Sequence, residues 1–161
     1  MDSARQPDSS DFYLAVGDTC SFAKTISESD VYLFAGVTGD FSPNHVNAQS
    51  MASSAYGQRV AHGALLVGLM STTSTMMVAR SRSMQGPPET PVALGYDRIR
   101  FLRPVFFGDT MTVVYTVSAV DAAKRRTTAD IRVTNQRGEL VCAATGLLKW
   151  VAVEGRLANS P

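Results

Sequence analysis

Residues 30–80 have the sequence DVYLFAGVTGDFSPNHVNAQSMASSAYGQRVAHGALLVGLMSTTSTMMVAR, and the second half of this stretch decides the fold. Residues 64–79 contain no charge and no proline, and their apolar side chains recur at helical spacing, which predicts one long α-helix. A helix that is apolar on nearly every side has to be covered by other elements, so we expect it to be buried. The apolar side chains at this spacing are Leu65, Leu66, Leu69, Met70, Met76 and Met77.

Strand-forming segments flank this stretch. Residues 16–26 predict a first strand, and after a connecting loop at 81–91 the pattern changes to alternation and to runs rich in β-branched residues. The later runs are separated by turns of hairpin length, so the sheet should be antiparallel. One strand, a helical block and four more strands predict an α+β domain in which an antiparallel sheet wraps around a long central helix. The four later strands are expected at residues 92–102, 110–120, 126–135 and 139–151.

Two shorter helices are expected before the long one. Ser27 or Ser29 is a suitable N-cap for the first, because an apolar set of residues follows at once. Gly39 and Pro43 should end this helix, since both residue types interrupt helices. The second short helix is expected at residues 47–56.

Length and composition limit the domain organisation and the partners. A chain of 161 residues is expected to form a single domain, at residues 13–153, between a flexible N-terminal tail at 1–12 and a C-terminal tail at 154–161. The formal net charge of +1 gives no reason to expect nucleic acid or a membrane surface as partner. The polar, acidic first residues are unlike a signal peptide, so a cytoplasmic location is expected. Cys20 and Cys142 lack the close spacing of a metal or redox pair and should be buried.

A polar loop, GDFSPNH at residues 39–45, contains a carboxylate and one of the two histidines of the chain. On a helix Asp40 and His45 would lie about 140° apart, but Gly39, Ser42 and Pro43 predict a turn that folds both side chains towards one point. An ionised carboxylate beside an imidazole can hold a water molecule, remove a proton from it and later return one. The same spacing also fits an acid and a histidine in a solvated surface loop.

The second histidine lies in Ala61-His62-Gly63, at the entrance to the long helix. A helix N-terminus offers unpaired N–H groups and a partial positive charge, and glycine lets a ligand approach the backbone closely. The Gly63 N–H is therefore a candidate donor to an oxyanion, such as the enolate of a thioester. The alternatives are a plain glycine at a helix start and, for His62, a structural histidine.

Residues 34–71, FAGVTGDFSPNHVNAQSMASSAYGQRVAHGALLVGLMS, resemble the signature of the (R)-specific enoyl-CoA hydratases, or MaoC-like dehydratases. In that family a glycine–Asp–x–Asn–Pro–aliphatic–His loop precedes a His-Gly pair, and RFLRPVFFGDTMTV at residues 100–113 resembles the strand and turn that follow. The resemblance covers residues 16–151. It implies a hot dog fold, a homodimer, and reversible syn addition of water to a trans-2-enoyl thioester.

The resemblance also implies roles for single residues. Asp40 and His45 match the catalytic pair, and Gly63 matches the donor to the thioester carbonyl. The sequence departs from the family motif at two positions, with Ser42 where the family usually has Asn, and Asn44 where it has Leu or Ile; both change the polarity beside the pair. The residues assigned to substrate binding are Ser71, His62 and Pro43.

No metal-ligand cluster and no glycine-rich dinucleotide motif is found in the sequence, so no separate cofactor is expected beside the acyl-CoA thioester that the resemblance implies as substrate. Two other functions share the predicted fold and the helix-end donor: a hot dog thioesterase, and a non-catalytic module that binds acyl thioesters. Phosphate groups of CoA are natural ligands for arginine. The arginines nearest the predicted site in sequence are Arg59, Arg80, Arg82 and Arg103.

Overall fold

The computed structural model describes residues 12–153, so the predicted C-terminal tail at 154–161 and all but Phe12 of the N-terminal tail predicted at 1–12 lie outside the described residues. Phe12, which the sequence prediction assigns to the N-terminal tail, is fully buried and meets the ring of Trp150 edge-on at 5.0 Å. Packing in the described chain therefore begins at Phe12. Within residues 12–153, no helix is long and apolar enough to cross a membrane.

The described strands form one antiparallel sheet in the order β1-β3-β4-β5-β2. This confirms the predicted α+β class, and the five strands lie close to the expected ranges. Their bounds are β1 Thr19–Thr25, β2 Glu89–Phe101, β3 Thr110–Asp121, β4 Arg126–Thr134 and β5 Leu140–Ala152. β2 begins inside the segment expected to be a loop, because Glu89 and Pro91 already pair with β5 at the edge of the sheet.

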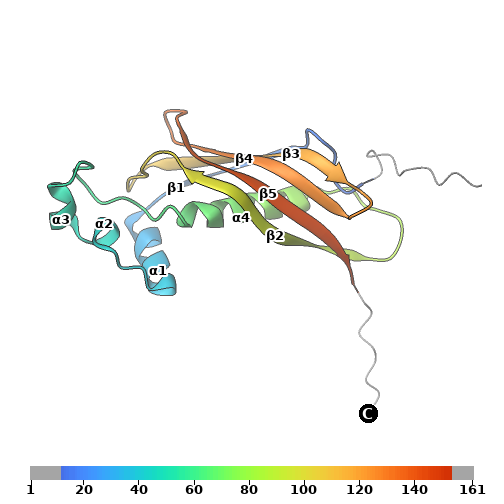
Figure 1. The fold of residues 1–161 in the computed structure, drawn as a ribbon, viewed down its shortest axis with the longest axis horizontal. Helices are drawn as coiled ribbons and strands as arrows, with labels where there is room; N and C mark the ends of the chain where they lie inside the picture. The colour runs from blue at the N-terminus through green and yellow to red at the C-terminus, as the bar shows by residue number, and fades with distance from the viewer. Residues whose placement is uncertain (1–11, 154–161) are drawn as a thin grey trace, which may run out of the picture.

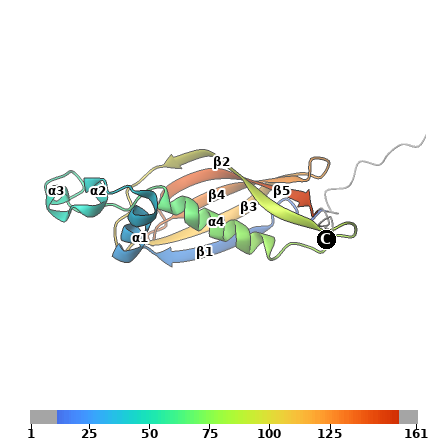
Figure 2. The same ribbon diagram turned by 90° about the horizontal axis from the view of Figure 1, so that it is seen from below.

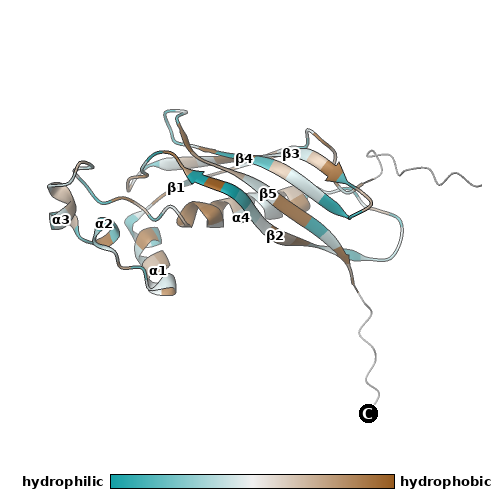
Figure 3. Ribbon diagram, in the orientation of Figure 1, coloured by the Kyte–Doolittle hydropathy of each residue, from teal (hydrophilic) through white to brown (hydrophobic). Residues whose placement is uncertain are grey.

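The long helix predicted at 64–79 is α4, Leu65–Val78, and it lies along the concave face of the sheet (Figures 1 and 2). Complete burial was the wrong expectation. The sheet covers only one side of α4, and the other side carries small or polar residues and leaves Met76 38% exposed. Figure 3 shows the apolar colouring of α4 next to the sheet. The side chains facing the sheet are Leu65, Leu66, Leu69, Met70, Thr73, Ser74 and Met77.

Three short helices project beyond one end of the sheet (Figures 1 and 2): α1 Glu28–Thr38, α2 Pro43–Val46 and α3 Ala48–Ala52. Ser27 caps α1 in a capping box, because its hydroxyl accepts the Asp30 N–H while the Asp30 carboxylate accepts the Ser27 N–H. Of the helix expected at 47–56, only the part in α3 forms, whereas α2 precedes it and lies mostly within the loop expected at 39–45. Asn47 separates them, since its side chain accepts the Ser50 N–H and starts α3 anew.

The alternation expected in β2 is interrupted. Register shifts occur between Ala93 and Gly95 and between Asp97 and Arg100, so Tyr96 and Ile99 both pack against the core although simple alternation places them on opposite faces. Arg98, inside the second shift, has a φ of 54°. Cys20 and Cys142 are buried free thiols, as predicted.

Candidate active site

The turn after α1 positions Asp40. Gly39 ends the helix in the left-handed conformation, with φ 80°, and its N–H donates to Ala35 O. The Ser42 N–H and hydroxyl both donate to Asp40 Oδ1, at 3.2 and 2.5 Å. These bonds, the hydroxyl bond first, hold the pKa of Asp40 below its usual value. Asp40 Oδ2 accepts no hydrogen bond from the described residues and faces two histidines.

His45 lies on α2, a helix of only four residues, and is 8% exposed. Its Nδ1 lies 2.7 Å from Val60 O, and because a carbonyl can only accept, Nδ1 carries the proton. In the neutral ring Nε2 is then the acceptor, and it lies 4.0 Å from Asp40 Oδ2. The turn that the sequence predicted does bring the carboxylate and the imidazole together.

His62 contacts both members of this pair. Its Nε2–H donates to the backbone carbonyl of Asp40 at 2.9 Å, and its ring stacks on the ring of His45 with the centroids 3.7 Å apart. Phe34 of α1 packs against His62 with a centroid distance of 4.9 Å. Nδ1 of His62 is buried without a partner among the described residues. Sequence reasoning placed His62 only at the helix entrance and missed its contact with the pair.

The same three side chains could hold a metal ion, since one donor atom from each of Asp40, His45 and His62 lies within 4.8 Å of the others. No spacing in the sequence indicates this cluster, because its members are separated by 5 and 17 positions. In the arrangement described, however, Nε2 of His62 donates its proton to Asp40 O. A metal would compete for that nitrogen and would push the proton to the buried, unpartnered Nδ1.

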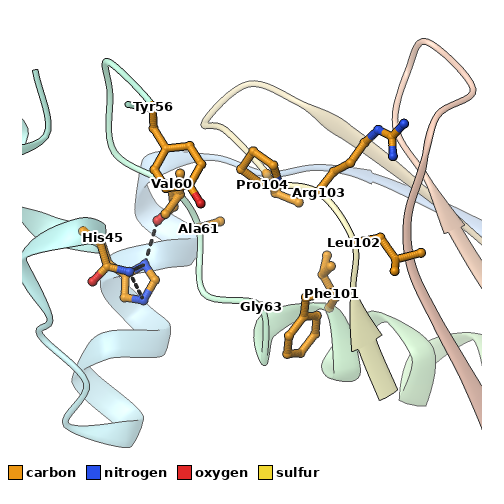
Figure 4. A pocket seen from close by; sticks show the side chains of 12 residues that line it. His45, Tyr56, Val60, Ala61, Gly63, Phe101, Leu102, Arg103 and Pro104 are labelled. Atoms are coloured by element: carbon orange, nitrogen blue, oxygen red, sulfur yellow. Dashed lines mark hydrogen bonds between the residues drawn. The ribbon is translucent and has the colours of Figure 1, made fainter. Parts of the chain in front are cut away.

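Gly63 lies two residues before α4, beside a cavity of about 310 Å³ that His45 also lines. Its N–H donates to no backbone group among the described residues. A Cβ on Gly63 would approach the ring of Phe101 to 2.9 Å, so glycine is needed for this close contact. Figure 4 shows Phe101 below Leu102, with its ring beside Gly63. The other lining residues are Asn44, Tyr56, Val60, Ala61, Leu66, Leu102, Arg103, Pro104 and Val105.

None of the three residues assigned to substrate binding lines this cavity, and neither does Asp40. Pro43 is exposed at the first position of α2, and Ser71 is exposed on the side of α4 away from the sheet. Their predicted roles remain predictions. Conversely, Val60 O and Phe101 shape the site without any signal in the sequence, because each acts through a contact between distant segments. Asn44, which the sequence marked as a departure from the family motif, contacts the adjacent His45 ring.

Comparison with known proteins places this site in a family. A family model described as a MaoC like domain matches residues 13–138. The chain belongs to the MaoC-like dehydratase family. A relative named (R)-specific enoyl-CoA hydratase, from Rhodospirillum rubrum, is 38% identical over 109 residues, which cover 68% of this chain and 69% of the relative.

Solved structures agree with this membership. The (R)-hydratase from A. caviae involved in PHA biosynthesis superimposes with a TM-score of 0.74 at 28% identity, covering 84% of this chain and 96% of that one. A hot-dog-like protein from Thermanaerovibrio acidaminovorans superimposes with a TM-score of 0.58 at 17% identity, over 86% of this chain and 84% of the other. This MaoC-like chain thus has the hot dog fold that the sequence resemblance implied.

Proposed function

We propose that this protein is an (R)-specific enoyl-CoA hydratase that also works in reverse as a 3-hydroxyacyl-CoA dehydratase. The observation that carries the proposal is the 4.0 Å gap between Asp40 Oδ2 and His45 Nε2. One water molecule can bridge two acceptors at that separation, donating a hydrogen bond to each. The names of the relatives, enoyl-CoA hydratase and 3-hydroxybutyryl-CoA dehydratase, support the same chemistry.

In the proposed hydration, the oxygen of this water attacks C3 of the enoyl thioester while the Asp40–His45 pair takes its proton. The double-bond electrons move towards the thioester carbonyl, whose oxygen becomes an enolate near the Gly63 N–H. A proton from the pair is then delivered to C2 on the same face, so that one water is added in total. Dehydration follows the same steps backwards. No separate cofactor takes part in any step.

Incubation with crotonyl-CoA tests this function. Enoyl absorbance should fall without release of free thiol, and the product should be the (R)-3-hydroxyacyl thioester. Thiol release would identify a thioesterase instead. If a folded protein binds the thioester but changes neither signal, with this or longer enoyl-CoA substrates, the protein is a binding module and the proposal fails.

We further propose a homodimer in the cytoplasm. In the described sheet, β1 and β2 are edge strands, and pairing of an edge with its copy across a two-fold axis would satisfy its free backbone groups. The exposed apolar residues of β2, Leu94 and Phe101, favour a covered edge. Buried free thiols agree with a reducing compartment. Sedimentation equilibrium should give twice the chain mass, and a mass near one chain would exclude the dimer.

Among the four arginines nearest the site in sequence, Arg103 is best placed to meet a CoA phosphate. Arg59 is engaged with Glu28 and Tyr32, whereas Arg80 and Arg82 follow the far end of α4. Arg103 lines the cavity and makes no ion pair among the described residues, and Figure 4 shows its guanidinium directed away from Gly63. With the thioester carbonyl at the Gly63 N–H, we expect the CoA phosphates to extend to that side.

Arg103→Ala should therefore raise KM for crotonyl-CoA by about tenfold, the size of one charge-assisted contact, with little change in kcat. Arg80→Ala serves as the matched control and should leave both constants unchanged. An Arg103→Ala enzyme with an unaltered KM would rule out this phosphate contact.

A further inference from the structure

Asn44 places its carboxamide on the imidazole of His45. Nδ2 of Asn44 lies 3.2 Å from Nε2 and 3.5 Å from Nδ1 of His45. A group in line with the lone pair of one ring nitrogen would be much farther from the other nitrogen. The nearly equal distances therefore put the amide over the face of the ring, so that it does not occupy the in-plane lone pair of Nε2.

The opposite face of His45 is covered by His62, whose ring centroid is 3.7 Å away with an interplanar angle of 28°. Two groups at such distances cannot share one face, so the imidazole is held between His62 and the amide of Asn44. The edge of the ring is fixed as well, because Nδ1–H donates to Val60 O.

The backbone of Asn44 belongs to the same arrangement. Val60 N–H donates to Asn44 O at 2.9 Å, while Val60 O accepts from His45 Nδ1 at 2.7 Å. The backbone of Val60 is therefore hydrogen-bonded to both Asn44 and His45, which are neighbours on α2. Since α2 has only four residues and no side-chain cap, these ties and not the helix itself fix the position of His45.

We propose that Asn44 is a positioning residue for the proposed hydration, which holds the His45 ring so that Nε2 points at the water between it and Asp40. This role rests on the proposed function. With the hydrogen bond from Nδ1 alone, the ring could still tilt about that bond. Asn44 on one face and His62 on the other prevent this motion. Reaction rates are sensitive to such displacements, because a misplacement of about 1 Å can cost about 10²-fold.

This role depends on a residue that departs from the family motif. The family motif that residues 39–45 resemble has an aliphatic residue in place of Asn44, which fills similar space but presents no N–H to the ring. The variant Asn44→Leu removes the amide at nearly constant volume. Asn44→Asp keeps the shape and replaces the donor with an anion, which favours the charged imidazolium. Gln49→Leu, on exposed α3, is the matched control because Gln49 makes no side-chain hydrogen bond in the described chain.

With crotonyl-CoA as substrate, Asn44→Leu should lower kcat by about tenfold and leave KM within about twofold. Asn44→Asp should move the acid limb of the kcat/KM profile to higher pH, since a base must be neutral to take a proton. Gln49→Leu should change neither quantity. If all three variants have the kcat of the parent enzyme and the same dependence of kcat/KM on pH, the assignment is overturned.

A second measurement separates this inference from the proposed function. The chain has two histidines, so its proton NMR spectrum has two imidazole Cε1–H signals, and His62→Gln identifies which belongs to His45. Asn44→Leu should shift the His45 signal, whereas Gln49→Leu should not, whether or not the protein hydrates crotonyl-CoA. An unshifted His45 signal in a folded Asn44→Leu protein would refute the contact itself. A shifted signal in a protein without hydratase activity would refute the proposed function. It would retain only the contact between Asn44 and the His45 ring.

Discussion

Asp40→Asn should lower the rate of enoyl-CoA hydration by about 10² to 10⁴, the range typical of lost general acid–base catalysis. The bonds from Ser42 keep the pKa of Asp40 below its usual value, so the carboxylate is ionised throughout the neutral range. Asparagine can still accept both bonds from Ser42. It loses the negative charge at the position of Oδ2, which faces His45 and the proposed water. The fold should survive, because the Asp40 side chain is 47% exposed.

His45→Ala should lower the rate by a comparable factor, and the double variant should be little worse than either single one. Residues that act on one water and one proton lose their joint effect when either is removed, so their contributions are not additive. Initial rates with crotonyl-CoA measure all three variants, and thermal melts establish that each is folded. His45 is buried, so its replacement by alanine can also affect folding. The rate of this variant is therefore interpreted only if its thermal melt is cooperative.

The matched control for Asp40→Asn is Asp97→Asn, which neutralises another exposed aspartate, on β2. Surface substitutions away from a site usually change stability by under about 0.5 kcal/mol, and this control should hydrate crotonyl-CoA at the parent rate. If Asp40→Asn behaves like Asp97→Asn, the carboxylate is only a solvated loop residue. The catalytic assignment would then be wrong even though the fold is that of a hydratase.

Gly63→Ala is expected to cost about 10²-fold in kcat/KM, which is the scale of losing one oxyanion donor. Gly63 does not have a positive φ, so backbone strain is not the reason. The added Cβ would meet the Phe101 ring at 2.9 Å. Phe101 is 52% exposed and can swing away, but both residues line the cavity beside His45. Either the methyl group or the displaced ring then occupies space next to the Gly63 N–H.

Removing the clash should restore part of the activity. Phe101→Ala in the Gly63→Ala background is expected to recover at least about tenfold in kcat/KM, because the methyl group then has room. Gly68→Ala, inside α4, is the matched control, because a Cβ there would meet nothing within 4 Å, and it should leave the rate unchanged. A Gly63→Ala enzyme that melts earlier but turns over at the parent rate would mark Gly63 as a packing glycine with no catalytic part.

The sequence by itself determined the features that depend on near neighbours along the chain. Helical spacing placed α4 within a residue of its ends, and Ser27 was one of the two serines expected to cap α1, because a cap and the N–H that it accepts lie three positions apart. The GDFSPNH turn belongs to this class as well, since Ser42 binds Asp40 from two residues away. Asp40 and His45 could therefore be paired from their local sequence alone.

Tertiary structure alone decided the features that depend on contacts between distant segments. One side of α4 is exposed because a single sheet covers only the other side, which the apolar composition of the helix does not reveal. Val60 binds His45 from 15 positions away, and Phe101 lies against Gly63 from 38. Such contacts follow from how the sheet, α2 and the segment before α4 pack together. The sequence therefore indicated the candidate catalytic side chains, and packing decided how they are held.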